Sequence, residues 1–240
     1  MMALLAEGIV GNLAASAVAF ILGLGMRRIW IDFTRRRPAG RLWGALRNKR
    51  VEIVMTTAAE RSAGEHTALV YPADAMAATE IGAFLTHALK ADCRLRLSHA
   101  LPGTAWDRNL ITIGGPIHNE VTRKLLLATG ATVTFDGHTI VLPNGNRYVA
   151  ETSLNQDGET VIDRDFGLVL RAPNPYKADE ITTLLIGSRT FGCLIAARAM
   201  LHENTRLSSG LINSSGTFGL VASAHVVDGQ VQETSILESW

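Results

Sequence analysis

The sequence predicts an α/β fold in which a mainly parallel β-sheet is flanked by helices and extended by a β-hairpin insertion. From residue 51 onward, short runs rich in β-branched residues alternate with segments whose apolar residues recur at helical spacing. Between residues 131 and 163 this alternation gives way to short strands joined by the turn sequences FDGHT and LPNGNRY. With a hydrophobic content of 47%, the chain can form a sizeable core, so we expect one α/β domain over residues 51–240.

The predicted elements follow one another in the order of an α/β domain. The first strand is VEIVMTT, and a loop containing Gly64 leads from it to the first helix. A strand, a glycine-containing turn and a helix share residues 181–203, and the final hairpin turns at Asp228 and Gly229. The remaining elements are strands at residues 93–98, 109–113 and 166–175 and helices at residues 73–91 and 118–129.

The N-terminal segment is expected to cross a membrane. Residues 8–26, GIVGNLAASAVAFILGLGM, carry no charge and are long enough to span a lipid bilayer, so residues 1–30 are predicted to form a transmembrane anchor. Arginines follow the apolar run, and the positive-inside rule therefore places the C-terminal domain of this single-pass chain in the cytoplasm. The alternative is a buried helix of a soluble protein, which the apolar residues on every helical face disfavour. Small residues offer a packing face for a homo-oligomer: Gly8, Gly11, Ala15 and Ala19.

Residues 31–50 form a basic segment that we interpret as a juxtamembrane linker. Trp30 and Trp43 lie among its arginines, as expected for anchors at the interface with anionic headgroups. A flexible soluble linker and a nucleic-acid patch are the alternatives. The net charge of the whole chain is only +1, so the rest of the chain is mildly acidic and nucleic acid is not an expected partner.

Two glycine turns are the main candidates for a binding site. In NLITIGGPIHN the glycines follow a strand and precede a helix, which predicts ligand contacts from Gly114, Gly115, Pro116 and Asn119. In this interpretation Pro116 occupies the first helical position and Asn119 lies in the first turn. In open α/β sheets such turns lie beyond the carboxyl ends of the strands, where helix N-termini favour anions.

The second turn, in LLIGSRTFG, has the same placement and adds a cation. The turn offers main-chain amides, two hydroxyls and a guanidinium, which are groups suited to binding phosphate or carboxylate. The predicted ligand contacts here are Gly187, Ser188, Arg189 and Thr190. Neither turn matches GxGxxG or GxxxxGK[ST], so the dinucleotide fingerprint and the P-loop are absent and no particular cofactor is identified. The structural alternative is that these glycines only permit strand-to-helix turns.

Further polar residues are predicted near the same edge of the sheet. Thr56 and Thr57 end the first strand, and Asp74 begins the next helix, where it caps the helix or meets a ribose hydroxyl. Asp163 and Asp165 form a pair of carboxylates that could bind Mg²⁺ or share a proton, although a solvated strand entrance is the favoured interpretation of both.

The cysteines and histidines do not add a further site. Cys93 and Cys193 are far apart in apolar surroundings and form no CxxC pair, which argues against a disulfide or a zinc site. The histidines are scattered without paired metal-ligand spacing, and His118 alone adjoins a predicted turn. No metal site and no catalytic residue are therefore assigned from the sequence.

The segments NLITIGGPIHN, RDFGLVLRAPNP and LLIGSRTFG together resemble a pattern in uncharacterised bacterial proteins that join a single membrane span to a Rossmann-like cytoplasmic domain. IGGPxxN also resembles a motif in archaeal surface-layer proteins, whose location conflicts with a cytoplasmic domain. The first resemblance implies a Rossmann-like sheet over roughly residues 50–205.

These observations leave three functional hypotheses open. The first is a membrane-anchored domain that binds a nucleotide or another phosphorylated metabolite as a sensor or effector. The second is a nucleotide hydrolase or N-glycosidase that uses Asp74, Asp163 or Asp165. The third is a membrane-tethered assembly scaffold without a ligand.

Overall fold

The computed structural model of this protein describes residues 42–62, 65–202 and 217–240. The predicted membrane span at residues 8–26, the anchor at residues 1–30 and most of the basic segment lie outside these ranges. Within them, no helix combines the length and the apolar character needed to cross a membrane.

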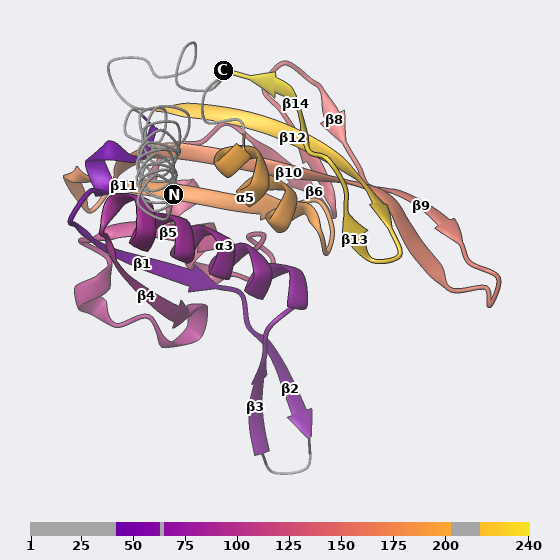
Figure 1. Ribbon diagram of the computed structural model, residues 1–240, viewed down its shortest axis with the longest axis horizontal. Coiled ribbons are helices and arrows are strands. Elements are labelled where there is room, and N and C mark those ends of the chain that lie inside the picture. The colour runs from indigo at the N-terminus through magenta and orange to yellow at the C-terminus, as the bar shows by residue number, and fades with distance from the viewer. Residues whose placement is uncertain (1–41, 63–64, 203–216) are drawn as a thin grey trace, which may run out of the picture.

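Three α-helices and a series of strands make up the described domain (Figure 1). The α-helices are α3 (Pro72–Leu89), α4 (Glu120–Ala128) and α5 (Gly192–His202), and the short 3-10 helices are η2 (Gly44–Leu46), η3 (Ser98–Ala100) and η4 (Gly103–Ala105). The strands of the first half are β1 (Arg50–Met55), β2 (Ala58–Ser62), β3 (Glu65–Leu69), β4 (Asp92–Leu97), β5 (Asn109–Ile113), β6 (Thr134–Asp136), β7 (Thr139–Val141) and β8 (Arg147–Tyr148). Those of the second half are β9 (Glu151–Leu154), β10 (Thr160–Asn174), β11 (Lys177–Gly187), β12 (Phe218–Val227), β13 (Gln230–Val231) and β14 (Ser235–Ser239).

The main sheet is mixed, which corrects the expectation of a mainly parallel one. Its strand order is β4-β1-β5-β11-β10-β12-β13, with β9 paired to β10 and β14 paired to β12. The four strands β4, β1, β5 and β11 are parallel, whereas β10 is antiparallel to β11, β12 and β9. The reason is a connection of two residues between β10 and β11, because such a tight turn can join only antiparallel neighbours.

Helices cover both faces of the sheet and form two hydrophobic cores. On one face α3 and α5 pack side by side (Figure 1), and their core includes Ile53 of β1, Leu85 of α3 and Ile195 of α5. On the other face α4 and the small β6-β7-β8 sheet enclose a second core, which includes Leu125 and Ile140. This three-layer arrangement explains why the central strand β5 is buried along its whole length.

The domain begins before residue 51, within the basic segment. Trp43, which the sequence placed at a membrane interface, is instead fully buried, and its ring centroid lies 6.4 Å from that of Phe84. Leu42 and Leu46 are buried in the same core. A fragment of the domain must therefore retain residues 42–50, because its core is incomplete without them.

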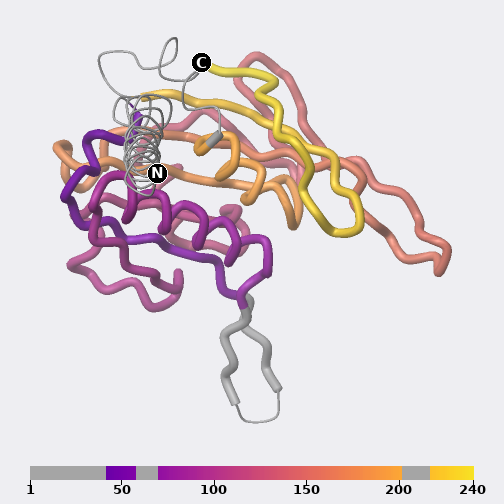
Figure 2. The backbone as a smooth tube through the Cα atoms, viewed as in Figure 1, coloured from indigo at the N-terminus to yellow at the C-terminus, as the bar shows by residue number. Residues whose placement is uncertain are grey.

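Three further regions refine the predicted elements. The expected loop around Gly64 contains the antiparallel pair β2 and β3. The β insertion is present as the β6-β7-β8 sheet and as β9, which pairs with β10 in an arm that extends from the body (Figure 2). The predicted turn at Asp228 and Gly229 is confirmed, since both residues have positive φ, +50° and +72°, between β12 and β13.

Candidate functional site

A pocket of about 190 Å³ lies at the carboxyl ends of β1, β5 and β11, which are adjacent and parallel. Thr56 follows β1, Gly114 follows β5, and Gly187 ends β11, so each strand delivers its next residues to the same edge. This is the edge at which open α/β sheets bind their ligands. The lining residues are Thr56, Tyr71, Asp74, Gly114, Gly115, Pro116, Ile117, His118, Phe135, Gly137, His138, Gly187, Ser188, Arg189, Thr190 and Cys193.

The two predicted glycine turns meet in this pocket. The Gly114 amide donates to the carbonyl oxygen of Leu185 in β11 at 3.0 Å. A Cβ placed on Gly115 would lie 4.0 Å from the carbonyl oxygen of Gly187, which is ordinary van der Waals contact. The end of β11 and the turn after β5 therefore lie side by side in the lining of the pocket. Their closest contact is the main-chain hydrogen bond between Gly114 and Leu185.

Gly114 is the residue that allows the first turn to pass beside β1. Its φ is +120°, a conformation that L side chains rarely adopt. A Cβ at this position would lie 1.5 Å from Thr56 Oγ1, which leaves no room for any side chain. The glycine is therefore required both by its backbone conformation and by the contact with Thr56.

Two of the predicted site residues lie elsewhere. Asn119 is fully buried and caps α4: its Oδ1 accepts from the Thr122 amide at 3.1 Å and its Nδ2 donates to the Ile113 carbonyl at 3.0 Å. The helix thus begins at Glu120, and Pro116 lies in the preceding turn rather than at the first helical position. Thr57 lies outside the pocket, where its Oγ1 is 2.9 Å from His99 Nδ1. The other predicted residues line the pocket.

The turn after β11 carries a hydroxyl with a structural role, on Ser188, and an exposed cation, on Arg189. The buried Ser188 hydroxyl donates to the carbonyl of His138 and accepts from the Ala150 amide at 3.2 Å, which ties the β6-β7 hairpin to the turn. Arg189 is exposed, and within the described residues its guanidinium has neither a hydrogen bond nor an ion pair. Arg189 is thus the cation at this pocket that remains available to a ligand.

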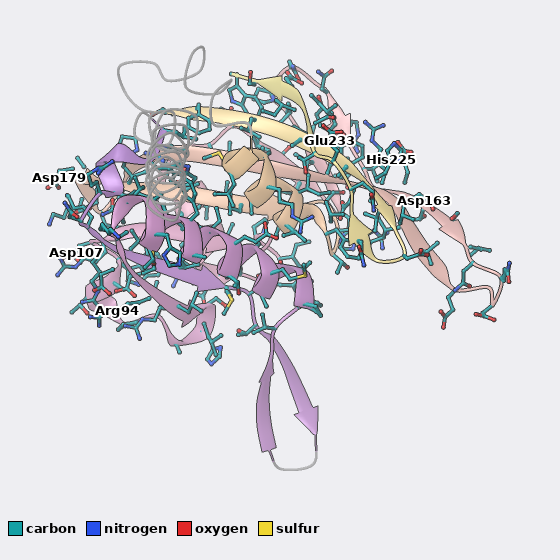
Figure 3. All side chains as sticks on the ribbon, in the orientation of Figure 1. Arg94, Asp107, Asp163, Asp179, His225 and Glu233 are labelled. Atoms are coloured by element: carbon teal, nitrogen blue, oxygen red, sulfur yellow. The ribbon has the colours of Figure 1, made fainter. Side chains whose placement is uncertain are left out.

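Asp165 is fully buried, which corrects the expectation of a solvated strand entrance. Its Oδ1 accepts from the amides of Phe166 at 2.7 Å and Arg189 at 3.1 Å, and its Oδ2 accepts from Phe191 at 2.9 Å. Burial raises the pKa of Asp165, and the backbone hydrogen bonds oppose this shift only in part. The carboxyl of Asp165 therefore holds the turn that carries Arg189. Asp163 lies further out on β10 (Figure 3), where it accepts from the Ser153 hydroxyl.

Asp74 forms the polar floor of the pocket together with Thr56 and Cys193. The Asp74 side chain is nearly buried, and burial raises its pKa more than its hydrogen bonds with Cys193 and Thr56 lower it. Thr56 Oγ1 donates to the Ile113 carbonyl oxygen at 3.0 Å.

Cys193 is an inert member of this floor. Burial, followed by the charge and the hydrogen bond of Asp74, raises the pKa of Cys193 well above its ordinary value. The side chain is therefore a thiol and not a nucleophilic thiolate. In the described part of the chain, no three His, Cys, Asp or Glu side chains are grouped so that they could hold a metal ion.

The sequence did not assign the aromatic residues that surround the pocket. Tyr71 precedes α3, and its ring centroid lies 6.5 Å from that of His118 at an interplanar angle of 56°. Phe135 and His138 come from the β6-β7 hairpin. Of these, His118 alone had a local signal, since it adjoins the glycine turn in sequence. The hairpin residues arrive by long-range packing, which no local pattern records.

The fold and the pocket together define an α/β domain with a small pocket at the carboxyl edge of its parallel strands. The chain matches no protein-family model and no curated protein. Its function is therefore inferred from the geometry and the chemistry of this pocket.

Proposed function

We propose that this domain binds a nucleotide or a similar phosphorylated metabolite in the pocket and acts as a membrane-anchored cytoplasmic sensor or effector. The observation that carries the proposal is the meeting of two glycine turns beside Arg189, whose guanidinium has no partner among the residues that the structure describes. Main chain can approach an anion closely at such turns, and a guanidinium can bind phosphate through two parallel hydrogen bonds. In this proposal the parallel strands β4, β1, β5 and β11 are the Rossmann-like part of the domain.

The charge balance of the pocket supports an anionic ligand. Arg189 contributes a positive charge, and Asp74 is the carboxylic acid among the lining residues. Burial favours the neutral form of Asp74, so its opposition to an anion is reduced. The second acid nearby, Asp165, accepts main-chain hydrogen bonds beneath the turn and is not a lining residue.

Calorimetric titration of the full-length chain with nucleotides and cyclic dinucleotides tests the proposal. We expect one class of binding site, and Arg189→Glu should weaken it by tenfold or more, equivalent to about 1.4 kcal/mol. Arg94→Glu is the matched control, because Arg94 lies on the edge strand β4 away from the pocket (Figure 3). Absence of binding to every nucleotide would overturn the proposal, and so would equal losses in the two variants.

The membrane part of the proposal is supported by the sequence of residues 8–26 and by the arginines that follow. The full-length chain should remain with membranes after alkaline carbonate extraction, whereas residues 42–240 alone should be released. The shorter chain begins at residue 42 because Leu42 and Trp43 belong to the domain core. Release of the full-length chain by carbonate would contradict the anchor.

A second candidate function is hydrolysis of a nucleotide or cleavage of its N-glycosidic bond. One observation favours it: Asp74 faces the pocket with a raised pKa, as expected for a general acid. Asp163 and Asp165 are not lining residues, so they no longer share this assignment. Product formation from a bound nucleotide, lost in Asp74→Asn while binding persists, would establish turnover. Persistence of that turnover in the variant would remove Asp74 from the reaction.

A further inference from the structure

We propose that the ligand is a nucleoside monophosphate, with its sugar phosphate inside the pocket and its base against an aromatic rim formed by Tyr71, His118, Phe135 and His138. This inference rests on the proposed binding function and specifies the class of ligand. It draws on the volume of the pocket, on the charges that line it and on the origin of its aromatic residues.

The volume admits only part of a nucleotide. The pocket measures about 190 Å³, whereas sites that enclose a whole drug-sized ligand span roughly 300–1,000 Å³. A sugar phosphate fits the smaller volume, and the base must then lie at the mouth. The polar and the aromatic lining residues are separated in the same way. Thr56 and Asp74 form the floor of the pocket, and the aromatic rings line other parts of it.

The charges favour one phosphate group over three. Among the lining residues the side chain with a permanent positive charge is Arg189, and none is a lysine. A triphosphate carries several negative charges and is usually held by a lysine and a metal ion together with main-chain amides. The lining also contains the carboxyl of Asp74, which a second and a third phosphate group would bring close to further negative charge.

The aromatic rim is suited to a planar base. Tyr71 is 39% exposed although it is a large aromatic residue, and its ring lies 6.5 Å from that of His118 between centroids. Phe135 and His138 approach from the β6-β7 hairpin, which Ser188 fastens to the turn that bears Arg189. Bases stack on such rings whatever their hydrogen-bonding pattern, so the rim should add affinity with little preference among bases.

The test compares ligands that share the phosphate but differ in the base. Adenosine monophosphate, ribose 5-phosphate, adenosine and adenosine triphosphate are titrated into the full-length chain by calorimetry. We expect the monophosphate to bind at least about fivefold more tightly than ribose 5-phosphate, since this is the smallest factor that stacking of one base on an aromatic side chain contributes. Tyr71→Ala should remove most of this difference and leave the affinity for ribose 5-phosphate unchanged, while Tyr71→Phe should retain it.

Tyr176→Ala is the matched control, because Tyr176 is also exposed and packs edge-on against Trp106 rather than at the pocket. It should change neither affinity. Equal affinities for adenosine monophosphate and ribose 5-phosphate would overturn the inference about the base and leave the proposed function standing. Tighter binding of the triphosphate would overturn the inference about one phosphate group. Absence of binding to all four compounds, and to the wider nucleotide panel, would instead remove the proposed function itself.

Discussion

The turn that carries Arg189 depends on one buried carboxyl, and Asp165→Asn tests this dependence. Asp165 accepts three main-chain hydrogen bonds, from Phe166, Arg189 and Phe191, at 2.7, 3.1 and 2.9 Å. An asparagine side chain retains one acceptor oxygen and replaces the other with an NH₂ group. If the oxygen stays with Phe166 and Arg189, the amide of Phe191 faces a donor and loses its partner.

The expected loss follows from that one amide. Leaving a buried donor without a partner costs about 1–3 kcal/mol, so we expect Asp165→Asn to lower the free energy of unfolding by about 2 kcal/mol at neutral pH. For a chain of this size the midpoint of thermal unfolding should then fall by roughly 4–8 °C. Urea denaturation followed by circular dichroism measures the first quantity, and a thermal scan measures the second.

Asp163→Asn is the control, because Asp163 lies two residues away on β10 with an exposed hydrogen bond from Ser153. Its effect should stay within about 0.5 kcal/mol, as for most surface substitutions. Asp165→Asn should also weaken nucleotide binding, although Asp165 is not a lining residue, because the turn loses its support. Equal stabilities of the two variants would refute the role assigned to the buried carboxyl.

Three further substitutions test the floor and the first turn. Gly114→Ala should lower the free energy of unfolding by more than about 2 kcal/mol, because of the positive φ at this position and the clash with Thr56 Oγ1. Adding Thr56→Ala should restore a part of this loss. A neutral effect of Gly114→Ala in urea denaturation would refute this account. Burial holds the pKa of Asp74 above its ordinary value of 3.8, so this carboxyl stabilises the fold most at acidic pH and loses that contribution as pH rises through its folded pKa. Asp74→Asn should therefore reduce the fall in the free energy of unfolding as pH rises. Unfolding curves of the wild-type chain and the variant at several pH values measure this fall, and an equal fall in both would contradict the account. Asn119→Ala should cost about 1–2 kcal/mol by removing the cap of α4, and thermal unfolding unchanged from wild type would exclude that role.

The position of the pocket could be predicted because its signals are local. β1, β5 and β11 each end in a largely apolar stretch that leads into a polar or glycine residue, and this pattern is visible in VEIVMTT, NLITIGG and LLIGS. Parallel strands bring their carboxyl ends to one edge, so the two glycine turns were expected to meet. They do meet, because the Gly114 amide donates to the Leu185 carbonyl oxygen and a Cβ built on Gly115 would be in van der Waals contact with the Gly187 carbonyl oxygen.

The antiparallel half of the sheet could not be predicted in the same way. Strand direction depends on the connection, and the segment APNPYK contains no helix that would return the chain for a parallel strand. Its two prolines favour an extended backbone, which does not by itself show that the strands on both sides pair with each other. Pro173 pairs with Ile181, and the register shifts between Pro173 and Asn174.

The residues whose roles depend on long-range contacts could also not be predicted from the sequence. Asp165 resembles a solvated residue at a strand entrance until α5 packs over it, because its three partners include two amides from a turn more than twenty residues away. Phe135 and His138 reach the pocket because the β6-β7 hairpin packs on the second core and Ser188 donates to the His138 carbonyl. Asn119 was assigned to a ligand because its cap is recognisable only once the helix start is known.

The acidic groups beneath the pocket explain how the site can remain favourable to anions. Asp165 is engaged by main-chain amides, and burial disposes Asp74 to the neutral form more than its hydrogen bonds with Cys193 and Thr56 oppose it. Neither carboxyl then neutralises Arg189. Because Asp74 becomes charged as pH rises, it adds a negative charge to the pocket and lowers the affinity for phosphate. Asp74→Asn removes this contribution, so the phosphate affinity of the variant should fall less as pH rises than that of the wild-type chain.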